Sequence, residues 1–245
     1  MTDRPVWAMV PVKSFRGAKR RLSPILEPAE RAQLAHLMLQ DVLDALTACD
    51  RILAGVIVVT CDPQATAMAG RRGATALSDT PAAGINAAVA IAIRYLAGVP
   101  NSGMIVVPAD IPHLSPGAIE DAAAGISAPR AVVLVPATDD GGTNLLACAP
   151  AGAIVPGFGR DSFRRHCRAA HRAKIVPTIL RRRDVGRDID RPEDIAAFLS
   201  IGSATRTQAF LSELGAAERL RRWVRKRRRQ PDQLSSAALE VWAEQ

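Results

Sequence analysis

The sequence is poor in aromatic side chains, which make up only 4% of its 245 residues. Stacking platforms for nucleic-acid bases are therefore scarce. The four cysteines stand singly, without the paired spacing of a zinc site. No apolar run approaches the roughly 18 residues of a membrane span, and the first apolar stretch is too short for a signal peptide. We expect a reduced, cytoplasmic protein with no membrane partner.

Two common nucleotide-binding signatures are also missing. Neither the dinucleotide pattern GxGxxG nor the P-loop pattern GxxxxGK[ST] occurs. A classical dehydrogenase and a P-loop NTPase therefore lose their main support.

The positive charge is concentrated near the end of the chain. The formal net charge is +8, from 32 Lys and Arg against 24 Asp and Glu, and the segment 219–229 (RLRRWVRKRRR) holds eight of the basic residues. The rest of the chain is balanced, so a domain built around a nucleic-acid backbone is not expected. Two interpretations of the basic segment stay open. It is either a nucleic-acid or surface-binding module, or a helix face folded back on an acidic patch.

Apolar β-branched runs alternate with longer segments of helical periodicity, which predicts an α/β fold around a mostly parallel sheet. A domain at 1–200 followed by a helical, basic extension at 201–245 is expected. The predicted strands are 6–12, 55–60, 104–108, 131–135, 144–149 and 175–180. The predicted helices are 28–50, 85–96, 116–124, 161–173, 192–199 and 205–224, with a short one around Leu239.

A basic loop follows the first predicted strand. It carries Lys13, Arg16, Lys19, Arg20 and Arg21, with Gly17 among them. In open α/β sheets, ligands bind at the carboxyl edge of the strands, where this loop begins. The loop is either a solvated basic segment or a site that neutralises the charge of a pyrophosphate leaving group, and its position favours the second interpretation.

Three aspartates are candidates for an oxygen-ligand site. Asp110 lies at the end of a predicted buried strand, just before Pro112. A carboxylate at this place is a metal ligand, a base or the N-cap of the following turn. Asp188 and Asp190 alternate along an extended segment, so their carboxylates can converge. The alternative is that Asp190 caps the next helix, while Asp194 belongs to its first turn. Together the three carboxylates would suit Mg²⁺ bridging phosphate oxygens.

Two glycine-containing segments, 139–146 and 156–166, could bind an anion through backbone N–H groups and the hydroxyls of Thr143 and Ser162. Ser162 would begin the helix that carries His166, where an anion is favoured. A GG turn on its own more often makes a hairpin. His166 is equally compatible with a surface position.

Six motifs in order now point to one family. They are VPVKSFRGAKRRLS (10–23), GIN (84–86), PADIP (108–112), GGTN (141–144), FGRDSF (158–163) with His166, and DIDRPEDI (188–195). Over residues 4–199 the sequence resembles the CofC/FbiD guanylyltransferases of deazaflavin coenzyme (factor 420) biosynthesis. The resemblance implies a three-layer α/β/α nucleotidyltransferase fold, similar to the GT-A glycosyltransferases, with a mixed, mostly parallel sheet. It gives the extension after Ser200 no role.

The resemblance also implies an activity, the transfer of GMP from GTP to a three-carbon phospho-acid. The acid would be phosphoenolpyruvate, 3-phospho-D-glycerate or 2-phospho-L-lactate. The implied site residues are Asp110, Asp188 and Asp190 for Mg²⁺, with Lys19 also catalytic; Lys13, Lys19, Arg21, Gly84 and Asn86 for GTP; and Thr143, Gly159 and Ser162 for the phospho-acid. The alternative enzyme is a molybdopterin or sugar-phosphate nucleotidyltransferase. The oligomeric state, a homodimer included, is left open.

Overall fold

The computed structural model describes residues 4–79, 84–138 and 141–229, which contain a seven-stranded sheet in the order β3-β2-β1-β4-β6-β5-β7. The strands are β1 (Val6–Val12), β2 (Leu53–Thr60), β3 (Thr75–Ser78), β4 (Gly103–Val106), β5 (Ala131–Pro136), β6 (Thr143–Ala149) and β7 (Thr178–Ile179). Strand β6 runs antiparallel to β4 and β5, and the other neighbouring pairs are parallel. The predicted mixed, mostly parallel sheet is confirmed.

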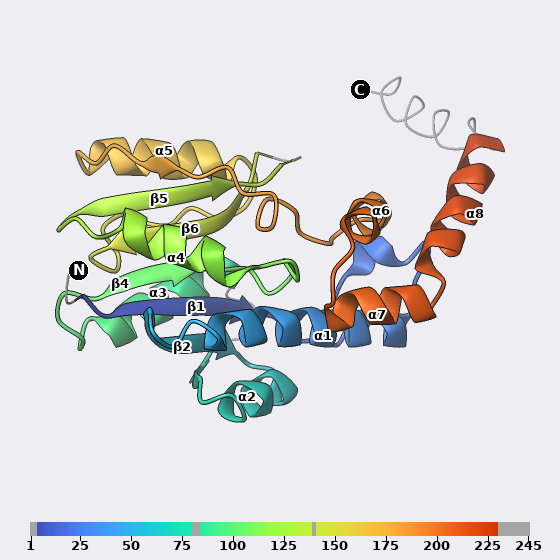
Figure 1. Cartoon of the computed structure of the whole chain (residues 1–245), viewed down its shortest axis with the longest axis horizontal. Coiled ribbons are helices and arrows are strands. Elements are labelled where there is room, and N and C mark those ends of the chain that lie inside the picture. Colours follow the sequence, from blue (N-terminus) through green and yellow to red (C-terminus); the bar gives the residue numbers. More distant parts are fainter. Residues whose placement is uncertain (1–3, 80–83, 139–140, 230–245) are drawn as a thin grey trace, which may run out of the picture.

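Helices cover both faces of the sheet (Figure 1). They are α1 (Pro28–Thr47), α2 (Pro63–Gly70), α3 (Gly84–Leu96), α4 (Pro116–Gly125), α5 (Ser162–Arg172), α6 (Pro192–Ile201), α7 (Arg206–Glu213) and α8 (Ala216–Arg229), with a 3₁₀ turn η1 at Arg20–Leu22. Alternation along β1 explains the layers. Ala8 and Val10 pack with α1, α2 and α4, whereas Met9 packs with α3 and α5 on the other face. Both faces of β1 are thus buried, and its carboxyl end leads directly into the basic loop.

A third apolar cluster lies at the end of the molecule where α6, α7 and α8 surround the start of α1 (Figure 1). It includes Leu22 from the basic loop and Ile189, which lies between Asp188 and Asp190 in residues 188–190, called the DID segment below. Asp41 of α1 holds the start of α7 beside this cluster by hydrogen bonds. Its carboxylate accepts from the backbone N–H groups of Arg206 (3.0 Å) and Thr207 (2.9 Å) and from the Thr207 hydroxyl (2.6 Å).

Most predicted elements appear within a few residues of their predicted bounds. Two elements, α2 and β3, were not predicted. The predicted strand 175–180 is shorter in the structure: only Thr178–Ile179 pair with β5, and Val176 is 85% exposed. The single helix expected over 205–224 is wrong: the chain breaks at Gly215, which adopts φ 59°, and continues as α8. The helix expected around Leu239 lies outside the described residues. Over the part of the chain that the structure describes, no helix has the length and apolarity to cross a membrane.

Candidate active site

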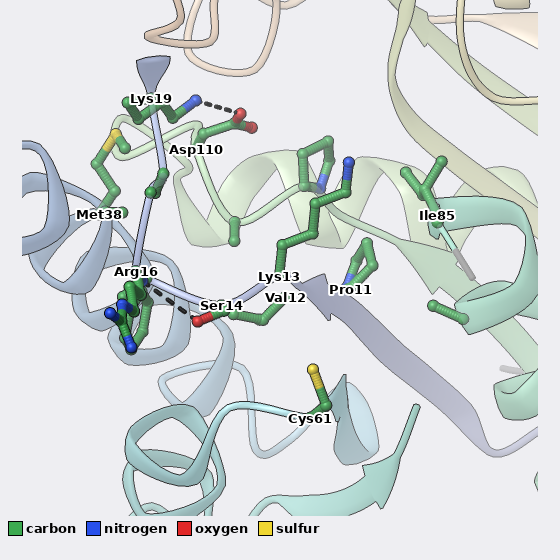
Figure 2. A pocket seen from close by; sticks show the side chains of 18 of the residues that line it. Pro11, Val12, Lys13, Ser14, Arg16, Lys19, Met38, Cys61, Ile85 and Asp110 are labelled. Atoms are coloured by element: carbon green, nitrogen blue, oxygen red, sulfur yellow. Dashed lines mark hydrogen bonds and ion pairs between the residues drawn. The ribbon is translucent and has the colours of Figure 1, made fainter. Parts of the chain in front are cut away.

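A pocket of about 750 Å³ opens at the carboxyl ends of β1 and β4. Five of the residues that the family resemblance implies for Mg²⁺ or GTP line it: Lys13, Lys19, Gly84, Asp110 and Asp190. Figure 2 shows Lys13 reaching from the end of β1 into the space between Asp110 and Ile85, with Lys19 beside Asp110. The pocket therefore brings together cations and carboxylates from three distant parts of the sequence.

Lys19 is the centre of the charged cluster. Its backbone adopts a left-handed conformation (φ 51°) just before η1, and its side chain is only 10% exposed. The ammonium donates to Asp110 Oδ2 at 2.6 Å and lies 3.8 Å from Asp190 Oδ1. Burial alone would lower the pKa of Lys19, but the contact with Asp110 and the nearby acidic charges outweigh burial and raise it. The lysine is thus held charged inside the pocket.

The two acidic segments meet through their backbones. The N–H of Ile189 donates to the carbonyl of Asp110 at 3.1 Å, which places the DID segment beside the end of β4. Burial, and then the negative charge of Asp110, raise the pKa of Asp188 to about 6. The Arg21 guanidinium is exposed and donates to Asp190 Oδ2 at 2.6 Å. Asp188 and Asp190 therefore both lie near Asp110, but Asp188 is not among the residues that line the pocket.

This arrangement is not a preformed metal site. No group of three carboxylate, imidazole or thiol side chains among the described residues is arranged to hold a metal ion. The Lys19 ammonium instead bridges Asp110 and Asp190. The donor set still suits a hard cation, because it offers only carboxylate oxygens. Burial first, and then the negative charge of Asp110, raise the pKa of Asp188, which a bound cation would lower.

The third acidic residue of the segment, Asp194, has a structural role. Its carboxylate accepts from the backbone N–H groups of Asp190 (2.9 Å) and Arg191 (2.6 Å) at the start of α6. This confirms its expected place in the first turn of that helix. Asp190 itself is not the helix cap, because Arg191 occupies that position.

Sequence reasoning missed the residue that fixes the basic loop. Asp62 follows β2 and caps α2 with one carboxylate oxygen, accepting from the N–H groups of Gln64 and Ala65. The other oxygen accepts from the Ser14 hydroxyl and the Phe15 N–H, each at 3.0 Å. An Asp-Pro pair directly after a strand is a helix-start signal that could have identified the cap, but not its contact with the loop.

Asn86, expected near the nucleoside, binds a loop. Its amide oxygen accepts from Phe158 N–H at 2.8 Å and its amide nitrogen donates to the Phe158 carbonyl at 3.2 Å. Gly84 and Ile85, at the start of the same helix, line the pocket. Asn86 therefore connects the pocket wall to the segment that carries Gly159.

The residues expected to hold the phospho-acid form a separate network, outside the lining of the pocket at the ends of β1 and β4. Thr143 and Ser162 are both buried, and the Ser162 hydroxyl donates to Thr143 Oγ1 at 3.3 Å. Thr143 Oγ1 also lies 2.9 Å from Nδ1 of His166, which is fully buried rather than on the surface. Gly159 is exposed and adopts φ 116°, a conformation that favours glycine.

Comparison with known proteins gives one family and a set of relatives. The family described as "Guanylyl transferase CofC like" matches residues 6–231. A phosphoenolpyruvate guanylyltransferase from Conexibacter woesei is 36% identical over 219 residues, covering 85% of this chain and 96% of the relative. A 3-phospho-D-glycerate guanylyltransferase from Phenylobacterium zucineum is 33% identical, covering 84% and 95%. The expectation that the similarity ends near residue 199 is wrong, since the family match extends through residue 231 and includes all of α7 and α8.

Solved structures share the fold at low sequence identity. A protein from Desulfovibrio desulfuricans G20, described as a nucleotide-diphospho-sugar transferase, superimposes with a TM-score of 0.70 at 16% identity, covering 91% of this chain and 99% of that one. A nucleotidyl transferase from Methanothermobacter gives a TM-score of 0.58 at 14% identity, covering 85% and 99%. The three-layer architecture is therefore that of known nucleotidyltransferases.

Proposed function

The chain belongs to the family of CofC-like guanylyl transferases, and from this premise we propose that it transfers GMP from GTP to a short phosphorylated carboxylic acid, with release of pyrophosphate. It is an enzyme of the nucleotidyltransferase class. The resemblance in the sequence motifs extends the proposal to the deazaflavin coenzyme (factor 420) pathway.

One observation carries the proposal: the Lys19 ammonium lies between Asp110 and Asp190 inside a pocket at the carboxyl edge of the sheet. Nucleotidyl transfer creates negative charge on a departing pyrophosphate, and positioned cations stabilise that charge. Lys13 and Lys19 enter the pocket from the two ends of the same loop. Arg21 is positioned beside it, in contact with Asp190. These side chains would bind the triphosphate and neutralise the leaving group.

The carboxylates would hold the metal. Asp110, Asp188 and Asp190 supply the oxygen ligands that Mg²⁺ prefers. When bound, Mg²⁺ would neutralise phosphate charge and help to orient the triphosphate. The contribution of this chain is to place the three carboxylates near one another, where burial first, and then the charge of Asp110, raise the pKa of Asp188.

The chemical step needs positioning more than proton transfer. A phosphate oxygen of the acid attacks the α-phosphorus of GTP, a P–O bond forms, the bond to the β-phosphate oxygen breaks, and pyrophosphate leaves with the bonding electrons. The attacking phosphate is already ionised at pH 7, so no strong base is required. Thr143, Gly159 and Ser162 would hold the acid for this attack, and in-line orientation would supply much of the rate enhancement.

The test is a panel of acceptors. Purified protein is incubated with GTP, Mg²⁺ and, in turn, phosphoenolpyruvate, 3-phospho-D-glycerate and 2-phospho-L-lactate, and pyrophosphate release and product mass are followed. We expect one acid to give a guanylylated product. Failure with all three would overturn the proposed reaction. A thermal-shift scan of the four nucleoside triphosphates separates it from another nucleotidyltransferase, because the nucleotide that binds the native state stabilises it.

A further inference from the structure

His166 of α5 uses both ring nitrogens in contacts inside the protein. The side chain is 0% exposed. The backbone N–H of Gly157 donates to Nε2 at 2.9 Å, and Nδ1 lies 2.9 Å from the hydroxyl oxygen of Thr143. The Phe158 ring packs edge-on against the imidazole with the ring centroids 4.8 Å apart. The imidazole therefore joins the loop before α5 to the start of β6.

These contacts determine which nitrogen carries the proton. A backbone N–H can only donate, so Nε2 must accept and is unprotonated. In the neutral ring the hydrogen is then on Nδ1, which donates to Thr143 Oγ1. Burial, and then the charge of Arg165, lower the pKa of His166 to about 4, so the ring is neutral at pH 7.

The direction of that bond restricts the Thr143 hydroxyl. Its oxygen accepts one hydrogen bond from His166 and another from Ser162, at 3.3 Å. Two accepted hydrogen bonds occupy both lone pairs of the Thr143 oxygen. The hydroxyl can therefore interact with a third partner only by donating its hydrogen. A donor of this kind recognises a carboxylate or phosphate oxygen and discriminates against a hydrogen-bond donor.

We propose that His166 is a positioning residue for the acceptor substrate: it orients the Thr143 hydroxyl so that its hydrogen is offered to an anionic oxygen of the phospho-acid. This role rests on the proposed function, which gives Thr143 to the phospho-acid. His166 does not touch the substrate and takes no proton in the reaction.

Two substitutions separate the two sides of the ring. In His166→Asn the amide nitrogen takes the place of Nδ1 and can still donate to Thr143, but the acceptor for Gly157 is lost. In His166→Gln the amide oxygen can still accept from Gly157, but the donor to Thr143 is lost. Each variant removes one hydrogen bond, so a purely structural role predicts similar effects on KM from both.

We expect His166→Gln to raise the KM for the phospho-acid about tenfold while the KM for GTP stays within about twofold. His166→Asn should leave the phospho-acid KM within about threefold of wild type. In a Thr143→Val background, His166→Gln should have no further effect, because the hydroxyl that it orients is gone. Equal KM changes in the two variants, or an undiminished effect in the Thr143→Val background, would overturn the role.

A measurement on the wild-type protein needs no variant to fold. Nitrogen-15 NMR of the histidines at pH 7 should show a neutral His166 with its hydrogen on Nδ1; a hydrogen on Nε2 would overturn the proposal. The outcomes also separate the two proposals. If the wild-type protein transfers GMP to none of the acids, the proposed function is overturned. If the wild-type protein is active but His166→Gln has an unchanged KM for the phospho-acid, only the positioning role is overturned.

Discussion

The Lys19 ammonium donates to the Asp110 carboxylate at 2.6 Å and so joins the loop after β1 to the segment after β4. The two residues are 91 positions apart in the sequence. This contact places a buried cation where triphosphate and metal would meet. It partly offsets the negative charge of the aspartates before any ligand binds.

Lys19→Met should lower the rate of pyrophosphate release at least about 100-fold, because a positioned charge at a developing anion contributes about 3 kcal/mol. The matched control is Lys226→Met, which removes a lysine on α8 and should leave the rate within about twofold. Steady-state assays at saturating GTP check both. A Lys19→Met rate within threefold of wild type would remove Lys19 from the chemistry.

Asp188→Asn should abolish turnover and yet stabilise the metal-free protein at pH 8. Burial first, and then the charge of Asp110, raise the pKa of Asp188 to about 6, so its carboxylate is charged in the folded state only above that pH, where its burial and its repulsion from Asp110 destabilise the protein. As the pH falls below about 6, the native carboxyl gains its proton and the stability advantage of the variant should shrink.

Thermal unfolding in EDTA from pH 4.5 to pH 8 measures the effect of Asp188→Asn, and Asp50→Asn at an exposed turn serves as its control. Addition of Mg²⁺ should raise the melting temperature of wild type more than that of Asp188→Asn. A melting-temperature difference that does not depend on pH would contradict the charge explanation.

The buried His166 should make the protein sensitive to acid. Its folded pKa of about 4 lies below the ordinary value of 6.5, so between these pH values the unfolded chain takes up a proton that the native state refuses. The free energy of unfolding should therefore fall as the pH drops from 6.5 to 4, by up to about 3 kcal/mol from this residue. Urea unfolding of wild type and His166→Asn across this range isolates the contribution, since the variant cannot titrate. Parallel curves for the two proteins would refute it.

Asp41→Ala should destabilise the protein by about 3 kcal/mol, since two backbone N–H groups and the Thr207 hydroxyl lose their buried acceptor. Asp41→Asn keeps an acceptor oxygen and should cost less. Asp50→Ala, at an exposed position, should change the free energy of unfolding by less than about 0.5 kcal/mol. Urea denaturation compares the three, and equal losses for Asp41→Ala and Asp50→Ala would show that α7 does not depend on this carboxylate.

The sheet could be predicted from the sequence because its central strands are apolar runs and because α1 buries Leu34, Met38 and Val42 at helical spacing. Elements β3 and α2 were missed for physical reasons. Strand β3 is a four-residue edge strand that is half-buried on one side. Helix α2 is a short run rich in alanine with no strong apolar stripe.

In the site, proximity between aspartates was predictable but contacts over long separations were not. Asp110, Asp188 and Asp190 each end or follow an extended segment, which is a local signal. The Asn86–Phe158 contact joins residues 72 positions apart and depends on the packing of α3. The burial of His166 was not predicted, because its neighbours in the sequence are mostly arginines. Ser162, His166 and Ala170 nevertheless recur every four residues and form the buried stripe of α5.

The basic loop and the DID segment pack against the same apolar cluster, since Leu22 and Ile189 are buried together with side chains of α6, α7 and α8. We therefore expect substitutions of the buried side chains of α7 and α8 to change how closely Lys19 and Asp190 approach each other. A genetic screen for loss of activity should therefore recover substitutions in α7 and α8 that touch no substrate. High concentrations of nucleotide and metal should restore the activity of these variants. They should not restore the activity of variants with substitutions in the pocket.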